Sequence, residues 1–498
     1  MEIGVGGRMM SELIDEVSFV MNPKCTFNYT QINSTTIKYF PSCPAVYGIL
    51  VINLATDLLI GQLRTAFINM KKLFGGIRIE NTKWNTLNMF STSNFKFYCD
   101  YYGFYAINNS QLSDATFLKE MNSQTSEALV NCHFHIENNP HLDMETLCAE
   151  GFLASLTSIK TKGNLKNCGC QGDEITSSNL PEYTDCTTLY NGLKLYNLTD
   201  VSSLSALSNI ENIRGDIRIE NTLIQNLSFL VNWKSWKIRN YGTVILNIQN
   251  NSEFTSLPSS FFKMLETFRL PANTDNPILT GNFENSHPEF CVSIEQILGI
   301  FEKKMSFDTF QSRICNDMGN IEENLVCRFV SMTDLPNNCD IILGNLIIEH
   351  GDEGFLVKLR GISTVIGSVI IRNTELENFK DIASNLNIIS LDDSLPVIQI
   401  VGNKNLTDIT FNSLLNVITR GPREAVIQDN NPKLFQDGVP CKISQTYGPS
   451  GSRDYRTRLN ITGEDCGDRV EVKLPSGSNI PSIYLLFILT SVFYITDL

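Results

Sequence analysis

Three histidines in the stretch NCHFHIENNPH are the residues that come closest to a metal site. His133 and His135 are two positions apart, which places both on one face of a strand, and His141 follows in a turn region. A zinc site needs three or four ligands at defined spacing, and no third ligand accompanies the pair in that way. The sequence therefore favours a strand surface with a turn histidine, and it predicts no metal and no cofactor.

Cys168 and Cys170, in the stretch CGC, are the other residues that suggest reactive chemistry. They stand where one group of cysteines ends and the next begins, which favours structural disulfides over a redox-active pair. GVGGR near Gly4 lacks the preceding strand and the following Lys-Ser/Thr of a phosphate loop. Since the chain also contains no Gly-x-Ser-x-Gly, no kinase signature set and no His-Glu-x-x-His, we predict that the protein is not an enzyme.

The composition indicates a globular protein that passes through the secretory route. The net charge of −14, without any run of Lys and Arg, argues against a nucleic-acid partner. The 14 cysteines are an even number and are spread along the chain, which is typical of disulfides rather than of zinc ligands. Eight Asn-x-Ser/Thr acceptors predict N-glycosylation. They are Asn28, Asn33, Asn108, Asn197, Asn226, Asn250, Asn405 and Asn460.

The two ends of the chain bear on its location. Charged residues interrupt the segment 1–24, so it lacks the apolar stretch of a signal peptide, and we expect the authentic start to lie upstream. The apolar stretch 483–495 is short for a membrane span. The sequence has small residues from Ser476 onward, followed by a polar spacer and by this apolar tail. This is the order of segments in a glycosylphosphatidylinositol signal. We predict lipid attachment at Ser476 and a cell-surface location, with a short membrane tail or a secreted form as alternatives.

A repeated strand is the main clue to the fold. GGIRIENTKW begins at Gly75, GDIRIENTLI at Gly215 and GSVIIRNTEL at Gly367, and each is preceded by another apolar strand that begins with glycine. The earlier glycines, Gly48, Gly192 and Gly344, lie 27, 23 and 23 residues upstream of the later ones. A strand, a turn and a return path of this length predict the stacked rungs of a solenoid.

The residues within and after each strand predict its two faces and its turn. Ile217 and Ile219 alternate with Arg218 and Glu220, which predicts one face in the core and one in solvent. Asparagine tolerates the left-handed turn geometry, and its side chain can bond backbone groups, so we expect stacked asparagines to form a ladder. The candidates are Asn81, Asn221, Asn373, Asn403 and Asn430.

The cysteines divide the chain into three modules that resemble one another. A pair precedes the first strand of each module and a second pair follows its last rung, and these disulfide loops would close the ends of the solenoid. The pairs are Cys25–Cys43 and Cys148–Cys168, Cys170–Cys186 and Cys291–Cys315, and Cys327–Cys339 and Cys441–Cys466, with Cys99–Cys132 inside the first module. Spacing alone does not prove this connectivity.

Helical apolar spacing over 293–305 predicts a capping helix. Trp233 and Trp236 are expected in the core, with an exposed ligand anchor as the alternative.

This pattern resembles the receptor L domain, the ligand-binding module of the insulin-receptor and epidermal-growth-factor-receptor families. The matching features are the entries CPAVYGILVI, CTTLYNGLKL and CDIILGNLII, the rung G-x-[Ile/Val]-x-I-x-N-T and the later [Val/Ile]-x-x-N-x-x-[Leu/Phe] rungs. The resemblance implies a mainly β fold in which each module is a right-handed β-helix capped by disulfides and a helix. Because three modules abut and no kinase signature occurs, the chain looks like the kinase-less, multi-L-domain cell-surface proteins of that superfamily.

The expected organisation and function follow from these observations. The predicted parts are the N-terminal segment 1–24, receptor L domains 25–169, 170–326 and 327–466, a polar linker 467–482 and an apolar tail 483–498. We expect a non-enzymatic extracellular protein that binds a peptide or protein ligand, with insulin-like and EGF-like ligands as candidates, on the half-polar sheet of each module. The alternative is a structural or adhesion scaffold that associates with itself or with related L-domain proteins.

Overall fold

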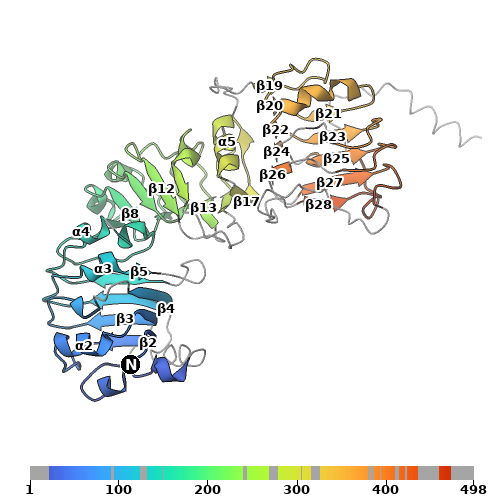
Figure 1. Cartoon of the computed structure of the whole chain (residues 1–498). Coiled ribbons are helices and arrows are strands. Elements are labelled where there is room, and N and C mark those ends of the chain that lie inside the picture. Colours follow the sequence, from blue (N-terminus) through green and yellow to red (C-terminus); the bar gives the residue numbers. More distant parts are fainter. Residues whose placement is uncertain are drawn as a thin grey trace, which may run out of the picture. The chain divides into compact units, whose positions relative to one another are not determined.

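The computed structural model describes residues 22–472 except for a set of gaps. The gaps are 91–94, 124–131, 150, 239–243, 268–278, 304, 316–325, 380–381, 383–385, 393, 410–413, 421–422 and 436–458. The chain divides into two compact units, Met1–Asp317 (unit 1) and Met318–Leu498 (unit 2), and each is built from parallel strands (Figure 1).

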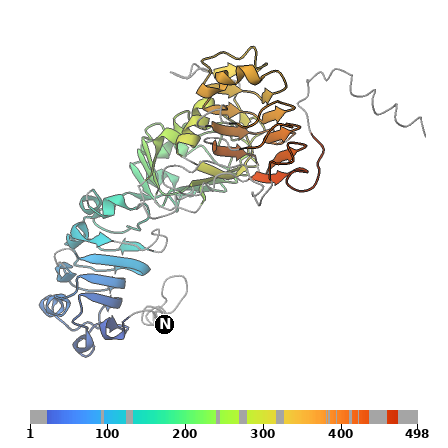
Figure 2. The same cartoon turned by 45° about the vertical axis from the view of Figure 1, so that its right-hand side comes forward.

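The N-terminal part of unit 1 is one parallel sheet whose strands follow in chain order. Figures 1 and 2 show β2, β3 and β4 side by side, and β4 is long enough to pair with both β5 and β6. The strands are β1 (Thr26–Phe27), β2 (Ala45–Ile52), β3 (Lys72–Glu80), β4 (Lys96–Ile107), β5 (Asn122–Ser123) and β6 (Phe134–Glu137).

The remainder of unit 1 distributes successive strands between two parallel sheets. One sheet contains β7 (Cys170–Gln171), β8 (Thr188–Tyr190), β10 (Asn212–Arg214), β12 (Ser235–Ile238) and β14 (Leu265–Thr267). The other contains β9 (Leu193–Tyr196), β11 (Ile217–Glu220), β13 (Val244–Gln249), β15 (Leu279–Glu284) and β17 (Met305–Phe310), and β16 (Cys291–Val292) pairs with β18 (Arg313–Ile314). Each repeat of about 23 to 35 residues therefore adds one strand to each sheet, as stacked rungs require.

Unit 2 has the same arrangement. Its first sheet contains β19 (Val326–Arg328), β20 (Ile341–Leu343), β22 (Thr364–Ile366), β24 (Leu386–Ser390) and β26 (Leu414–Thr419). Its second sheet contains β21 (Leu346–Ile348), β23 (Val369–Arg372), β25 (Ile398–Val401), β27 (Arg423–Gln428) and β28 (Leu459–Thr462). The described residues thus give a mainly β fold with few helices.

Helices occupy the segments that return from one strand to the next. The α-helices are α2 (Ile60–Phe67), α3 (Phe117–Glu120), α4 (Met144–Cys148) and α5 (Ile294–Glu302). The 3-10 helices are Pro23–Cys25, Ile37–Tyr39, Asn88–Phe90, Leu153–Ser155, Leu180–Tyr183, Leu204–Leu207, Phe261–Met264 and Glu353–Gly361. The predicted helix within 293–305 corresponds to α5, where the Ser293 hydroxyl accepts from the backbone N–H of Gln296 and the Gln296 side chain accepts from the backbone N–H of Ser293.

The glycines of the repeated motif stand where the backbones of adjacent rungs nearly touch. Gly75 has φ +136°, and a Cβ built on it would lie 2.2 Å from the carbonyl oxygen of Gly48. Gly215 has φ +116°, and its Cβ would lie 2.7 Å from the backbone nitrogen of Gly192. Both the positive φ and the close approach exclude a side chain. Gly215 lies between β10 and β11, where the chain passes from one sheet to the other, whereas Gly75 lies within β3.

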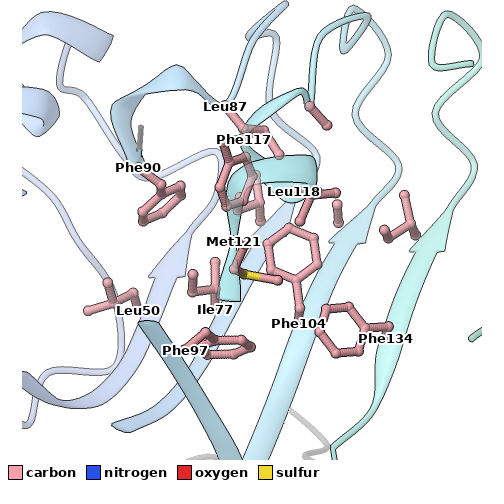
Figure 3. Close-up of a cluster of buried hydrophobic side chains, with 14 of the residues drawn as sticks. Leu50, Ile77, Leu87, Phe90, Phe97, Phe104, Phe117, Leu118, Met121 and Phe134 are labelled. Carbon is pink, nitrogen blue, oxygen red and sulfur yellow. The ribbon is translucent and has the colours of Figure 1, made fainter. Parts of the chain in front are cut away.

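The core is filled from successive rungs. Leu50, Ile77, Phe104 and Phe134, from β2, β3, β4 and β6, point into one interior, where side chains of the returning segments meet them (Figure 3). Ile217 and Ile219 are fully buried while Arg218 and Glu220 are half-buried, as the alternation predicts. Trp233 and Trp236 are also buried, and both contact the ring of Phe261, so they belong to the core and not to an exposed ligand anchor.

The asparagine ladder exists, but only two of the five asparagines predicted for it belong to it. Asn81, Asn221 and Asn373 are exposed turn residues with φ of 55°, 56° and 52°, so this part of the prediction is wrong. The ladder is made by the residue that follows each turn residue, which is why Asn403 and Asn430 take part in it. Because the turn residue has a positive φ, its own side chain points outward, and the side chain of the next residue points toward the neighbouring rung.

Each ladder side chain bonds the next rung in the same way. The side-chain oxygen of Asn139 accepts from the backbone nitrogen and the Nδ2 of Asn109, both at 3.1 Å. The Nδ2 of Asn139 donates to the carbonyl oxygen of Ala106 at 2.9 Å. The same pattern joins the other ladder residues. They are Thr82, Asn109, Asn139, Asn164 and Asn167, then Thr222 and Asn251, and in unit 2 Thr374, Asn403, Asn430 and Asp465.

Six of the seven predicted cysteine pairs are joined by disulfides in the described structure. They are Cys25–Cys43, Cys99–Cys132, Cys148–Cys168, Cys170–Cys186, Cys291–Cys315 and Cys327–Cys339. Cys466 is also disulfide-bonded, and its predicted partner Cys441 lies outside the described residues. The predicted modules 25–169 and 170–326 both fall largely within unit 1, and the division into three domains stays a prediction.

Candidate binding face

The sheet surface that points away from the core of unit 1, here called its outer face, brings polar and aromatic side chains into rows. In the N-terminal part, Arg78 of β3 pairs with Tyr105 of β4, Tyr105 with His135 of β6, and His135 with Lys160. Each of these residues stands three positions before a turn residue of positive φ. The pleat therefore points all four away from the core.

Hydrogen bonds and ring stacking hold this row in place. The guanidinium of Arg78 donates to Glu80 at 2.9 Å and to the hydroxyl of Tyr102 at 3.0 Å. The ring of Tyr105 stacks on that of His135 with centroids 4.8 Å apart, and the Nδ1 of His135 lies 3.1 Å from Glu137. Tyr105 is itself buried together with Tyr102, Ile49 and Val51, so the row is ordered but only Arg78, His135 and Lys160 in it are partly exposed.

The pKa values follow from the partial burial of these groups. Burial alone lowers the pKa of the Arg78 guanidinium, but its hydrogen bonds to Glu80 and Tyr102 raise it above its usual value, so Arg78 stays charged. Burial raises the pKa of Tyr105. Burial lowers the pKa of His133 and of His135, against the opposing effect of Glu137 on His135, and Lys160 lowers both.

We expect unit 1 to lose stability on mild acidification because of this pair of histidines. Their folded pKa values lie below the unfolded value of about 6.5, so the unfolded chain takes up these protons more readily than the folded one. Their contribution is complete above about pH 6.5 and is lost as the pH falls through the folded pKa values. Urea unfolding at about pH 7.5 and 5.5, followed by tryptophan fluorescence, measures this difference in the free energy of unfolding. A His133→Gln/His135→Gln variant that kept the whole pH dependence would contradict the assignment.

The second part of unit 1 continues the same pattern with more polar residues. Lys194, Arg218, Asn247 and Asn282 are neighbours on β9, β11, β13 and β15. The Nδ2 of Asn282 donates to Asn247 at 2.7 Å, and the Nδ2 of Asn247 donates to Glu220 at 2.6 Å. The side chains of Arg218 and of its neighbour Glu220 are 29% and 23% exposed, whereas Asn247 is buried, so the row is ordered and is open to a partner at Arg218.

Aromatic and acidic groups flank this polar row. Tyr196, at the end of β9, is 39% exposed and beside Glu220 in register. Asp216 lies 3.8 Å from Arg218, and burial raises the pKa of its carboxyl against the opposing effects of Arg218 and Lys194. Tyr and Arg are the side chains that most often dominate protein interfaces, so the outer face has the composition of a binding surface.

The sequence predicts the alternation of buried and outward residues in this face but not the rows that the outward residues form. The spacing to the turn residue was the available signal, since Arg78, Tyr105, Arg218 and Asn247 each stand three positions before it. Aligning the strands on those turn residues places the side chains of one row in one column. The rows can therefore be read from the sequence once the turn position is known.

The outer face of unit 2 differs from this, which corrects the expectation of a half-polar sheet in every module. Ile370, Gln399 and Val426 occupy successive outward positions on β23, β25 and β27, and each is only 1% exposed. Two of the three are apolar, and all are shielded from water. These positions of unit 2 are therefore closed to water, as the positions of Ile49, Val51, Tyr102 and Tyr105 in unit 1 also are, while the paired Arg372 and Glu349 of unit 2 stay partly exposed.

The other predicted site residues have the following places. His133 and His135 lie on the outer face with ring centroids 6.2 Å apart, and His141 is exposed in the turn after β6. Within the described residues no group of three or more His, Cys, Asp or Glu side chains is placed to hold a metal ion. The predicted acceptors Asn28, Asn108, Asn197, Asn250, Asn405 and Asn460 are exposed, and Asn33 and Asn226 are half-buried.

The predicted anchor cannot be placed in the structure. Ser476 and the apolar tail 483–498 lie outside the described residues. In the part of the chain that is described, no helix combines the length and the apolar character needed to cross a membrane.

Stacked parallel strands with disulfide-closed loops and an ordered polar face define the class of fold. Comparison with known families agrees, since residues 185–293 and 338–441 match the family model of the receptor L domain. These two segments of the chain are therefore similar to the receptor L-domain family. The two matched segments lie in the second and third predicted modules. No curated protein matches the chain significantly.

Proposed function

We propose that this protein is a non-enzymatic, receptor-like binding protein that takes a peptide or protein ligand on the outer face of unit 1. The observation that carries the proposal is the row Lys194–Arg218–Asn247–Asn282 with Tyr196 beside it. Lys194, Arg218 and Asn282 are partly exposed and Tyr196 is exposed, whereas Asn247 is buried. Hydrogen bonds join Asn282 to Asn247 and Asn247 to Glu220. A fixed surface of this kind loses little side-chain entropy when a partner binds. The match of two segments to the receptor L-domain family supports the same function.

The finer architecture is part of the proposal. We infer three tandem receptor L domains, 25–169, 170–326 and 327–466, each a right-handed β-helix. Three observations support this inference: the parallel stacking, the cysteine pairs at the ends of each predicted domain, and the start of one asparagine ladder in each at Thr82, Thr222 and Thr374.

We also infer an extracellular, glycosylated protein that is lipid-anchored at Ser476. Six disulfides among the described residues support an oxidising compartment. The exposed acceptor asparagines are accessible to glycosylation. On the cell surface, the outer face of unit 1 would meet soluble peptides or proteins, with insulin-like and EGF-like ligands as the first to test.

The test uses cells that express the full chain behind a secretion signal. Phosphatidylinositol-specific phospholipase C should release the protein, and deglycosylation should lower its mass. The released protein should bind one member of a panel of labelled insulin-like, EGF-like and other secreted peptides saturably. Self-association without peptide binding would favour the scaffold alternative, and the absence of both would contradict the proposed function.

Variants of the outer face locate the binding site. An Arg218→Ala/Tyr196→Ala variant should weaken ligand binding by roughly 30-fold or more, since Arg and Tyr anchors commonly contribute about 2 kcal/mol or more. Lys234→Ala is the matched control, because Lys234 is an exposed cation paired with Glu211 away from this row. Equal losses in the two variants would place the ligand elsewhere.

A further inference from the structure

The segment that follows β28 lies against the outer face of unit 2. The backbone N–H of Val470 donates to the side-chain oxygen of Gln428 at 2.9 Å, and the Nε2 of Gln428 donates to the carbonyl oxygen of Val470 at 3.2 Å. The guanidinium of Arg469 pairs with Asp429 at 2.7 and 2.9 Å. The Gln428 amide thus holds both polar groups of one residue, as a neighbouring strand would.

The burial of this segment shows that it is extended and faces the sheet on one side. Val470 and Val472 are half-buried, whereas Arg469 and Glu471 between them are exposed. A period of two is the signature of an extended chain with one face covered. Arg469 contacts Asp429, which follows the end of β27, and Val470 contacts Gln428, the last residue of β27. The segment therefore runs from the end of β27 toward the middle of the face.

Gln399 is the unexplained residue on this face. It is 1% exposed, and among the described residues, Val472 included, neither its Nε2 nor its Oε1 has a hydrogen-bond partner. Buried amides are almost always bonded, because an unsatisfied one loses its hydrogen bonds to water without replacement. An orphaned amide among Ile370 and Val426 therefore indicates a polar partner that reaches it.

The geometry of the sheet identifies that partner. Gln428 is in register with Val401 and Gln399 with Val426, so the two glutamines are diagonal neighbours on adjacent strands. Such neighbours are about 7 to 8 Å apart. An extended chain presents equivalent peptide groups every second residue, or about 6.5 to 7 Å. The residue two positions after Val470 is Val472.

We propose that the outer face of β23, β25 and β27 is a docking track for the chain's own segment Arg469–Val472. In this track, the side chain of Gln428 hydrogen-bonds the backbone of Val470, and the side chain of Gln399 hydrogen-bonds the backbone of Val472. Ile370 and Val426 provide the apolar floor of the track. This face of unit 2 is then occupied by its own chain, and a partner gains access to it only by displacing the segment.

Limited proteolysis of the full chain tests the track. Trypsin cleaves after Arg469 only when the segment leaves the sheet, so Gln428→Leu and Gln399→Leu should each speed this cleavage at least fivefold. Gln249→Leu is the matched control, because Gln249 lies on β13 of unit 1 and should leave the rate unchanged. Rapid cleavage of the unaltered protein, or no response to Gln428→Leu, would overturn the docking track.

Hydrogen exchange distinguishes the Gln428–Val470 contact from the Gln399–Val472 contact, and it also shows whether a variant is misfolded. Gln399→Leu should speed exchange of the Val472 amide at least tenfold and leave core amides of β25 unchanged, whereas Gln428→Leu should act on the Val470 amide. If Gln399 has no partner in solution, Gln399→Leu instead leaves the Val472 amide unchanged and slows tryptic cleavage. That result would contradict the proposed contact between Gln399 and Val472.

Discussion

Replacing Gly75 with alanine is expected to destabilise unit 1 by about 3 kcal/mol or more. The backbone at Gly75 has φ +136°, and a new Cβ would lie 2.2 Å from the carbonyl oxygen of Gly48 on the next rung. The unfavourable φ costs about 1 to 3 kcal/mol, and the forced separation of two rungs adds about 1 to 3 kcal/mol. Trp84, Trp233 and Trp236 are the only tryptophans in the sequence and all belong to unit 1, so tryptophan fluorescence during urea unfolding of the full chain measures the change.

Gly61→Ala is the matched control and should have the opposite sign. Gly61 lies in helix α2, where no described atom outside its chain neighbours and the helix's own backbone comes within 4 Å of the added Cβ. Alanine favours a helix over glycine by up to about 1 kcal/mol, so this variant should be neutral or slightly more stable. Equal destabilisation by both changes would mean that rung contact is not what selects glycine at position 75.

Asn139→Leu should destabilise unit 1 by on the order of 4 kcal/mol. The change keeps the approximate size of a fully buried side chain but removes the acceptor of the backbone nitrogen and Nδ2 of Asn109, and the donor to Ala106. Each buried group left without a partner costs about 1 to 3 kcal/mol. Urea unfolding of the full chain, followed by tryptophan fluorescence, measures the loss.

The neighbouring asparagine provides the control. Asn138 is exposed with φ 57°, a conformation that glycine adopts without strain, so Asn138→Gly should change the free energy of unfolding by less than about 1 kcal/mol. Two adjacent asparagines of the same sequence motif should thus respond very differently. A large effect of Asn138→Gly with little effect of Asn139→Leu would assign the ladder to the wrong member of the pair.

Much of the fold could be predicted because its signals are local and repeated. The glycine-led strands, the alternation of Ile217 and Ile219 with Arg218 and Glu220, and the cysteine pairs each follow from short stretches of sequence. The ladder was assigned partly to the wrong residues because Asn81 and Asn403 look equivalent until φ is known. Only the three-dimensional turn shows that the first residue of each pair faces solvent and the second faces the next rung.

The candidate sites were harder to predict because they depend on contacts between distant residues. Arg78, Tyr105 and His135 are separated by about 30 residues at each step, and their rows emerge only from the strand register. The outer face of unit 2 needed still more information. Gln428 and Val470 are 42 positions apart, and no spacing rule connects them.

The asparagine ladders also have a direction, which follows from which atoms donate. In unit 2, Thr374 donates to Asn403, Asn403 to Asn430, and Asn430 to the carboxylate of Asp465. The side-chain dipoles therefore all point the same way along the stack and polarise one another. The series begins with the hydroxyl of Thr374, which donates, and it ends at the carboxylate of Asp465, which accepts. A ladder of this kind can be lengthened only by whole rungs inserted in the same orientation, so its polarity restricts how such a repeat can grow or be rearranged.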